Sequence, residues 1–70
     1  MNKFASNLKF YRKRNNLAQW HLAMLLKCDR STISAYETGK RECDFDTLIK
    51  IAKILNISTD NLLYDRREED

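Results

Sequence analysis

Glycine, proline and histidine are scarce in this 70-residue sequence, which has one glycine, no proline and one histidine. A single glycine cannot form the glycine-rich loop that cradles a phosphate group. The lone His21 has no cysteine or carboxylate placed to act with it, so neither a nucleophilic nor an acid-base site can be assembled around it. These absences exclude the common signatures of catalysis, and we expect that the chain is not an enzyme.

Cysteine is also rare. Cys28 and Cys43 lie 15 positions apart, and together with His21 they do not supply the four ligands of a structural zinc site. We therefore expect no bound metal and no cofactor. Because a reducing compartment keeps thiols reduced, we interpret the two cysteines as small apolar side chains rather than as a disulfide.

The sequence lacks a long apolar run. Nothing approaches the ~18 consecutive apolar residues that a membrane-spanning helix needs. Charges interrupt the first 16 residues, where a signal peptide needs an unbroken apolar segment. We expect a cytoplasmic protein without a membrane partner. Its length allows one domain, and 43% hydrophobic with 33% charged residues favours a folded, mainly helical chain.

Charge is distributed unevenly along the chain. The net charge is +3, but residues 1–41 contain nine lysines or arginines and two acids, a net charge of +7. Residues 42–70 contain four cations and eight acids, a net charge of −4. This asymmetry favours a polyanion as the partner of the first part of the chain, although an ordinary solvated surface can have the same composition.

Apolar spacing predicts five helices. Phe4, Leu8 and Tyr11 share one stripe of the first helix. We expect this helix to end at Asn15 and Asn16, because asparagine tolerates the left-handed conformation of a helix cap better than most residues do.

The second and third helices are joined by a short turn. The second is expected over residues 19–26, and the third over residues 30–38. Asp29 is expected to cap the start of the third helix, and Gly39 to end it. The inner side of the second helix is expected to contain Leu22, Ala23 and Leu26.

The last two helices complete the bundle. The fourth should begin after Asp44 and the fifth after Ser58, since both side chains can accept a capping hydrogen bond. Five helices with short connections and no strand pattern predict an all-α bundle over residues 1–64, followed by a charged C-terminal tail over residues 65–70. The apolar face of the fourth helix is expected to contain Phe45, Leu48, Ile49, Ala52 and Leu55, and the fifth helix carries Leu62 and Leu63.

The third helix has a polar outward face. Such a face is often merely solvated, but the turn of three or four residues before it is typical of a helix-turn-helix. In that motif the second helix enters the major groove, and short outward side chains let its backbone approach the base edges. The outward arc, about 140° wide, is expected to consist of Arg30, Ser31, Ser34, Ala35 and Thr38, opposite Ile33 and Tyr36.

Several short motifs stand at characteristic spacing in this sequence. They are Leu17, Gln19, the Leu22-Ala23 pair, "STIS", Tyr36-Glu37, "GKR", "DTLIKIAKIL" and "STDNLL". Through them, residues 4–63 resemble the helix-turn-helix domain of the Cro and phage-repressor (XRE) family. The resemblance implies a five-helix, lambda-repressor-like fold. It also implies a sequence-specific regulator of transcription, in most cases a repressor, that binds double-stranded DNA as a homodimer.

The resemblance also assigns roles to individual residues. Glu37 is implied to form a structural ion pair with Arg12 of the first helix. Arg30 can donate two hydrogen bonds to guanine, although a phosphate contact for Arg30 and a purely structural place for Gln19 stay open. Residues implied to contact bases are Arg30, Ser31, Ser34 and Ala35. Residues implied to contact phosphates are Gln19, Thr38, Lys40 and Arg41.

Three residues depart from the family pattern. Ala18 replaces the Ser or Thr that usually caps the second helix, at a cost of about 1 kcal/mol. Lys27 stands at a turn position where glycine is usual, so we expect a strained backbone angle there. Cys43 stands at a position where proline is frequent in the family. None of the three removes an implied DNA contact.

Four apolar residues fall away from the main stripes of their helices, namely Phe10, Trp20, Met24 and Ile54. Either the core is wider than the stripes, or these side chains form a surface for another protein. For a homodimer the candidate surfaces are Trp20 with Met24, and Leu62 with Leu63. The alternative function is a protein-interaction module such as the antitoxin of a toxin-antitoxin pair. A restriction-modification controller protein is a variant of the regulator.

Overall fold

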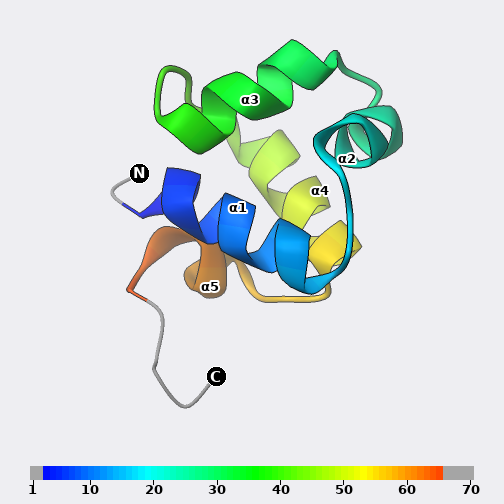
Figure 1. Ribbon diagram of the computed structural model, residues 1–70. Coiled ribbons are helices and arrows are strands. Elements are labelled where there is room, and N and C mark those ends of the chain that lie inside the picture. The colour runs from blue at the N-terminus through cyan, green and yellow to red at the C-terminus, as the bar shows by residue number, and fades with distance from the viewer. Residues whose placement is uncertain (1–2, 66–70) are drawn as a thin grey trace.

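Five helices and no strand make up residues 3–65, which are the residues described in the computed structural model. α2 and α3 lie at one end of the molecule and α5 at the other, with α1 and α4 between them (Figure 1). The predicted all-α bundle is thus confirmed, while residues 66–70 of the predicted tail lie outside the described residues. The helices are α1 (Phe4–Arg14), α2 (Gln19–Leu26), α3 (Arg30–Thr38), α4 (Phe45–Leu55) and α5 (Thr59–Leu63).

Each helix contributes at least one fully buried aliphatic side chain to a single core. Full burial of one such side chain stabilises the fold by roughly 1.5–3 kcal/mol. Phe4 and Tyr36 meet edge to face with their ring centroids 5.9 Å apart, which holds α3 against α1. The aliphatic side chains with no exposed surface are Leu8, Leu22, Ile33, Ile51 and Leu62.

The buried face of α4 differs from the predicted one at three positions, and at one of them Ile49 is only half-buried although the predicted face included it. Ile51 is completely buried, although the predicted face omitted it, and Phe45 is 72% exposed, although the predicted face included it. Phe45 lies one turn before Leu48, on nearly the same side of the helix. Phe45 is, however, the first residue of α4 and lies at the end of the apolar stripe.

Residues in the left-handed conformation end the first four helices. Asn16 follows α1 with φ 59°, Gly39 ends α3 with φ 80° and Asn56 ends α4 with φ 58°. Lys27 ends α2 with φ 59°, which confirms the strained angle expected at this position. A side chain with a Cβ makes this conformation unfavourable by about 1–2 kcal/mol.

Side-chain caps begin α4 and α5 but not α2 and α3. The Asp44 side chain accepts a hydrogen bond from the backbone N–H of Thr47 at 2.8 Å, and Ser58 forms a reciprocal capping box. Asp29 occupies the cap position of α3, but its side chain accepts no capping hydrogen bond, so that prediction was wrong. The N–H of Thr32, which such a cap would use, donates instead to the backbone carbonyl of Asp29 at 2.9 Å.

A buried asparagine joins α1 to the end of α5. Asn7 is 1% exposed, and its amide donates to the carbonyl oxygens of Leu62 and Tyr64 at 3.1 and 2.7 Å. These bonds occupy carbonyl groups at the C-terminal end of α5, where a helix leaves its backbone acceptors without internal partners. The short last helix is therefore held by a polar anchor as well as by Leu62.

Candidate nucleic-acid interface

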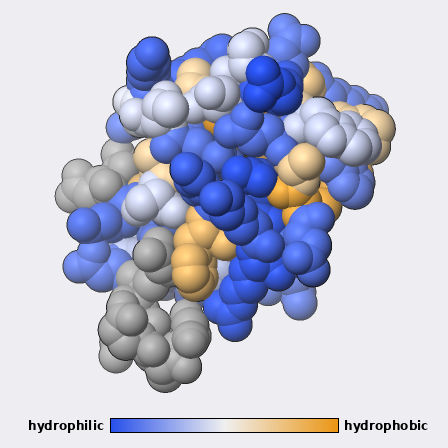
Figure 2. All heavy atoms as spheres, in the orientation of Figure 1, coloured by the Kyte–Doolittle hydropathy of each residue, from blue (hydrophilic) through white to orange (hydrophobic). Residues whose placement is uncertain are grey.

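The predicted outward face of α3 lies on the surface of the molecule. Ile33 and Tyr36 point inward and are buried, while the opposite side of the helix is solvent-accessible. Arg30, Ser31 and Thr38 are exposed, and Ser34 and Ala35 are half-buried. In Figure 2, hydrophilic side chains cover much of the visible face. We call this outward face the α3 ridge; it consists of Arg30, Ser31, Ser34, Ala35 and Thr38. Its central side chains are short, and a guanidinium lies at its start.

The turn between α2 and α3 is held by backbone hydrogen bonds. The N–H of Lys27 donates to the carbonyl of Met24 at 3.1 Å, and the N–H of Cys28 donates to that of Ala23 at 2.9 Å. The two helices pack against each other, and Leu22 of α2 and Ile33 of α3 both belong to the core. This arrangement is a helix-turn-helix in which α3 is the second helix.

A buried ion pair ties α3 to α1. The Nε of Arg12 donates to Oε2 of Glu37 at 2.5 Å, and its Nη2 donates to Oε1 at 3.0 Å. The side chains of Arg12 and Glu37 are only 8% and 3% exposed. Nη1 of Arg12 also donates to the carbonyl of Leu17 at 2.6 Å. The predicted structural ion pair is thus confirmed, and it fixes the α1–α2 connection as well.

Gln19 forms a bridge that the sequence did not predict. Its Nε2 donates to Oε1 of Glu37 at 3.1 Å, and its Oε1 accepts from Nη1 of Arg30 at 3.0 Å. The first residue of α2 and the first residue of α3 are therefore joined side chain to side chain. Only their residue types pointed to this pairing, because an amide can both donate to a carboxylate and accept from a guanidinium.

The cations after α3 are exposed, while their backbone groups are occupied. The N–H groups of Lys40 and Arg41 both donate to the carbonyl of Ala35, at 3.0 and 3.2 Å. The Thr38 hydroxyl lies 3.0 Å from the carbonyl oxygen of Ser34, to which it donates. The backbone N–H groups of these two residues are thus occupied, and their ammonium and guanidinium groups are the donors that face solvent.

The surroundings of both thiols disfavour the charged thiolate form. Cys28 is half-buried and Cys43 is buried, and both are free. Burial raises the pKa of Cys43 to about 11 and also raises the pKa of Cys28 above its usual value. Because the thiolate is the nucleophilic form, both thiols are less nucleophilic at neutral pH than an exposed cysteine. Within residues 3–65, no three His, Cys, Asp or Glu side chains gather as metal ligands.

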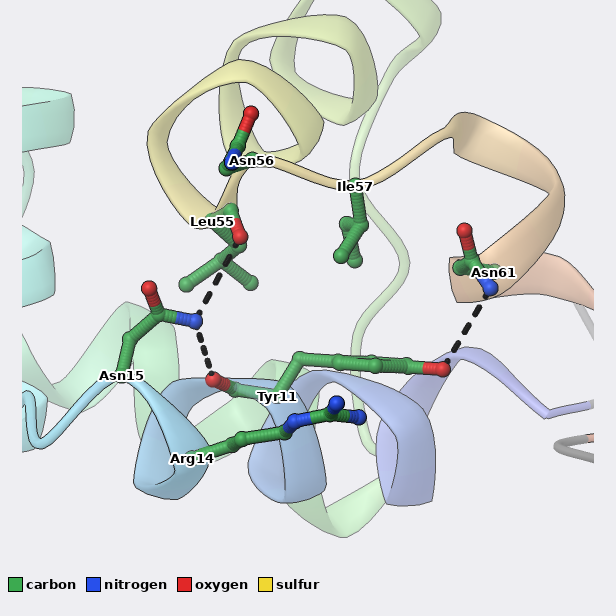
Figure 3. A pocket seen from close by; sticks show the side chains of 7 residues that line it. All are labelled: Tyr11, Arg14, Asn15, Leu55, Asn56, Ile57 and Asn61. Carbon is green, nitrogen blue, oxygen red and sulfur yellow. Dashed lines mark hydrogen bonds between the residues drawn. The ribbon is translucent and has the colours of Figure 1, made fainter. Parts of the chain in front are cut away.

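A hollow of about 390 Å³ lies between α1 and the α4–α5 connection (Figure 3). Asn15 Nδ2 donates to the carbonyls of Tyr11 and Leu55 at 2.9 and 3.4 Å, and Asn61 Nδ2 donates to the Tyr11 hydroxyl at 3.4 Å. These amides hold the helices together. The lining residues are Tyr11, Arg14, Asn15, Leu55, Asn56, Ile57 and Asn61, none of them on α2 or α3.

The candidate protein-interaction residues divide between surface and core. Trp20 and Met24 are 59% and 57% exposed, and apolar atoms reach the surface around α2 in Figure 2. Leu62 is completely buried, so its inclusion in a surface was wrong, because that side chain anchors α5 in the core. Leu63 is half-buried. Phe10 and Ile54 are half-buried and pack against the core, which favours the wider-core interpretation for them.

In the described residues, no helix is both long enough and apolar enough to cross a membrane.

The fold and the exposed α3 ridge define a helix-turn-helix domain of the phage-repressor type. Residues 5–66 match the family of helix-turn-helix domains, and the chain belongs to that family. It is 44% identical over 66 residues to the uncharacterized HTH-type transcriptional regulator YqaE of Bacillus subtilis, covering 94% of this chain and 57% of YqaE. It is 41% identical over 59 residues to the control protein C.SmaI of Serratia marcescens, covering 84% of this chain and 70% of C.SmaI.

Two solved structures share the fold. The restriction-modification controller protein C.AhdI of Aeromonas hydrophila has a TM-score of 0.79 and 33% identity, covering 86% of this chain and 91% of C.AhdI. The DNA-binding domain of the P22 C2 repressor has a TM-score of 0.81 and 26% identity, covering 90% of this chain and 86% of that domain. The chain thus spans little more than half of YqaE but nearly all of these two structures.

Proposed function

We propose that this chain is a sequence-specific regulator of transcription that binds double-stranded DNA with α3 in the major groove. The observation that carries the proposal is the exposed α3 ridge, whose central side chains are short and whose two ends are cationic at Arg30 and at Lys40 with Arg41. A major groove about 12 Å wide admits a helix only when side chains along its centre do not hold the backbone away. The kinship with transcriptional regulators and control proteins supports the same function.

The contacts divide into base readout and backbone positioning. Arg30 at the start of α3 would reach a guanine edge, and Ala35 would meet a thymine methyl group. Ser31 and Ser34 would lie against base edges between them. Contacts with phosphates set the affinity and its dependence on salt, and they carry no direct sequence information. The phosphate-contacting residues would be Gln19, Thr38, Lys40 and Arg41.

A homodimer would double this interface. One domain of this size reaches a single half-site, and two-fold pairing places two recognition helices about 34 Å apart along the DNA. Occupying an operator in this way would repress transcription by excluding polymerase. The proposal also places the protein in the cytoplasm, because its ligand would be DNA and both of its cysteines are free.

The antitoxin alternative and an enzymatic role have less support. The relatives named above are transcriptional regulators, control proteins and a repressor, and none of them is named as an antitoxin. Among the described residues, two amides in the lining of the hollow, Asn15 and Asn61, bond to neighbouring helices, and burial raises the pKa of both thiols. We therefore propose a non-catalytic protein that requires no cofactor.

Selection of bound sites from random DNA duplexes tests the function. We expect a palindromic sequence to emerge, with binding that weakens steeply as salt rises, by a log-log slope of about −0.9 for each phosphate contact. Lys40→Met should reduce that slope by about 1. Lys53→Met is the matched control, because Lys53 is an exposed cation on α4 and is not among the proposed DNA-contacting residues. Recovery of no preferred sequence, with weak binding even at low salt, would rule the function out.

A further inference from the structure

One side of α2 is an exposed apolar surface that plays no part in the proposed DNA contacts. Trp20, Met24 and Leu25 are 59%, 57% and 47% exposed. His21 lies among them on the same side and is half-buried. Helical spacing of about 100° per residue gathers these four side chains in an arc of about 140°, opposite the core. We call this arc the α2 face; it consists of Trp20, His21, Met24 and Leu25.

α2 is apolar on both its inner and its outer side. None of its eight residues is charged, and a helix that is apolar all round is ordinarily covered by other protein. The indole of Trp20 is also held in place, because it stacks on the imidazole of His21 with the ring centroids 5.2 Å apart. An ordered side chain loses little conformational freedom on binding, and tryptophan is enriched among the residues that dominate protein–protein contacts. The α2 face therefore has the composition of a contact surface.

The absence of charge favours a second copy of this chain as the partner. Residues 1–41 have a net charge of +7, so two copies repel each other over much of this part of the molecule. The α2 face is a neutral part of that surface, and an acidic partner would find no cation on it. Lys27 follows α2 at one end, and a two-fold, antiparallel contact keeps the two Lys27 ammonium groups apart. In such a contact, Trp20 of each copy meets Met24 of the other, and a thioether packs favourably against an aromatic ring.

The size of the α2 face determines when two copies can meet. Large side chains bury roughly 150–250 Å² each when fully covered, so three that are half-exposed offer about 300–400 Å² per copy. Two such faces together would bury about 700 Å², whereas a stable interface needs about 1,200 Å² or more. The α2 face is thus too small to hold a homodimer together in free solution. It becomes effective where a duplex already holds two copies side by side, because their effective concentration then rises to about millimolar.

α2 is placed where neighbouring copies on DNA would meet. It lies beside α3 at the edge of the molecule (Figure 1), so its outer face points sideways when α3 enters the groove. We propose that the α2 faces of two copies bound to neighbouring operators pack against each other and make the occupancy of those operators cooperative. The proposal rests on the proposed function, because the contact forms between copies that DNA holds in place. It adds regulation to that function, since occupancy then rises more steeply with protein concentration.

Duplexes with two copies of the selected operator test the cooperativity. In a series whose operator centres are separated by whole turns of about 10.5 bp, occupancy of one operator should strengthen binding at the other by about five- to a hundredfold. An added half turn should remove this effect, because the second copy then lies on the opposite side of the duplex. Met24→Glu should remove it at every separation, since a two-fold contact brings the two new carboxylates into one apolar interface. Met24→Leu should retain it.

Ser6→Glu is the matched control. Ser6 is an exposed residue of α1, so the substitution adds the same charge on a different helix. Both glutamate variants should bind a duplex with one operator equally well, and only Met24→Glu should lose cooperativity. If Met24→Glu binds the single operator more weakly than Ser6→Glu does, the proposal is overturned, because the α2 face would then act in DNA binding or in folding itself.

The fluorescence of Trp20 reports the contact directly, because Trp20 is the only tryptophan of the chain. Covering an exposed indole shifts its emission to shorter wavelengths. We expect this shift on the two-operator duplex with whole-turn separation. The single-operator duplex supplies the same DNA contacts without a neighbouring copy, and there the shift should be absent. An identical emission spectrum on the two duplexes would contradict the packing of Trp20 between copies.

Two further results would overturn the contact between α2 faces. One is independent binding of the unaltered protein at every whole-turn separation, which would leave the α2 face to a partner of another kind. The other is cooperativity that persists in Met24→Glu, which would place the contact elsewhere on the molecule. In both cases the operator is still recognised, so the proposed function survives. If random duplexes yield no preferred sequence, the proposed function itself has failed and the inference fails with it.

Discussion

Arg12 and Glu37 meet through two hydrogen bonds of 2.5 and 3.0 Å, with both side chains nearly excluded from solvent. One partner lies near the end of α1 and the other near the end of α3, so their contact sets the position of the helix that we propose for the major groove. Removing either partner leaves an uncompensated buried charge, whereas removing both leaves none.

Because one unpaired buried charge costs more than none, the effects of substituting Arg12 and Glu37 on the free energy of unfolding should not add. Arg12→Leu and Glu37→Leu should each lower the free energy of unfolding by about 3–5 kcal/mol. The double variant should be more stable than the sum of these losses implies, since no unpaired charge remains. Urea denaturation of all three variants measures this. Additive losses would mean that the two charges are solvated in the folded state.

The left-handed conformation of Lys27 predicts a stabilising substitution. Lys27 is exposed and has φ 59°, so Lys27→Gly should raise the free energy of unfolding by about 0.5–1 kcal/mol, because glycine adopts this conformation without steric cost. Lys50→Gly is the control, since Lys50 lies inside α4 and glycine there should destabilise by about 1 kcal/mol. Thermal denaturation measures both. A loss of stability in Lys27→Gly would show that the lysine side chain contributes more than its backbone strain costs.

The capping carboxylate of Asp44 predicts a pH dependence of stability. Hydrogen bonds from the side chain and the backbone of Thr47 lower the pKa of Asp44 below its ordinary value of 3.8. Its contribution to stability is therefore complete above that ordinary value, and it is lost as the pH falls through the lower pKa of the folded state. Asp44→Asn keeps an acceptor at the cap but does not ionise. Between about pH 5 and pH 2, the unaltered protein should lose more stability than this variant in urea denaturation. Parallel curves would contradict a stabilising role for the charge.

Two residues of α2 provide a matched test of burial. Leu22 is completely buried, while Met24, two positions along, is 57% exposed. Leu22→Ala should lower the free energy of unfolding by about 2–5 kcal/mol, and Met24→Glu should change it by less than about 0.5 kcal/mol. Denaturation should be measured at several protein concentrations.

The concentration series also tests pairing through α2. If Met24→Glu lowers the free energy of unfolding by an amount that grows with protein concentration, this surface is covered in a dimer. The reason is that dimerisation stabilises the folded state by mass action. Sedimentation of the same variant would then show a smaller particle than the unaltered protein. Unchanged sedimentation would exclude the Trp20 and Met24 surface as the dimer interface.

Local signals account for the parts of the fold that could be predicted. Four of the predicted helix ends are confirmed, because each depends on a few neighbouring residues. Examples are the Ser58 capping box and the glycine that follows Thr38. The outward direction of Arg30 and Ser34 also follows from helical spacing, since Ile33 and Tyr36 must face the core. The Arg12–Glu37 pair was expected only through the resemblance to a family, because 25 positions separate its members.

The amino-acid sequence by itself determined where the helices lie, which stripe of each is apolar, and that one polar ridge flanked by cations follows a short turn. These properties depend on side-chain type and on the geometry of a single helix. Only the tertiary structure decided that Phe45 is exposed, that Asn7 anchors α5, and that Gln19 joins Glu37 to Arg30. Those outcomes depend on which elements meet in space, and helical periodicity carries no information about the neighbour on the far side of a contact.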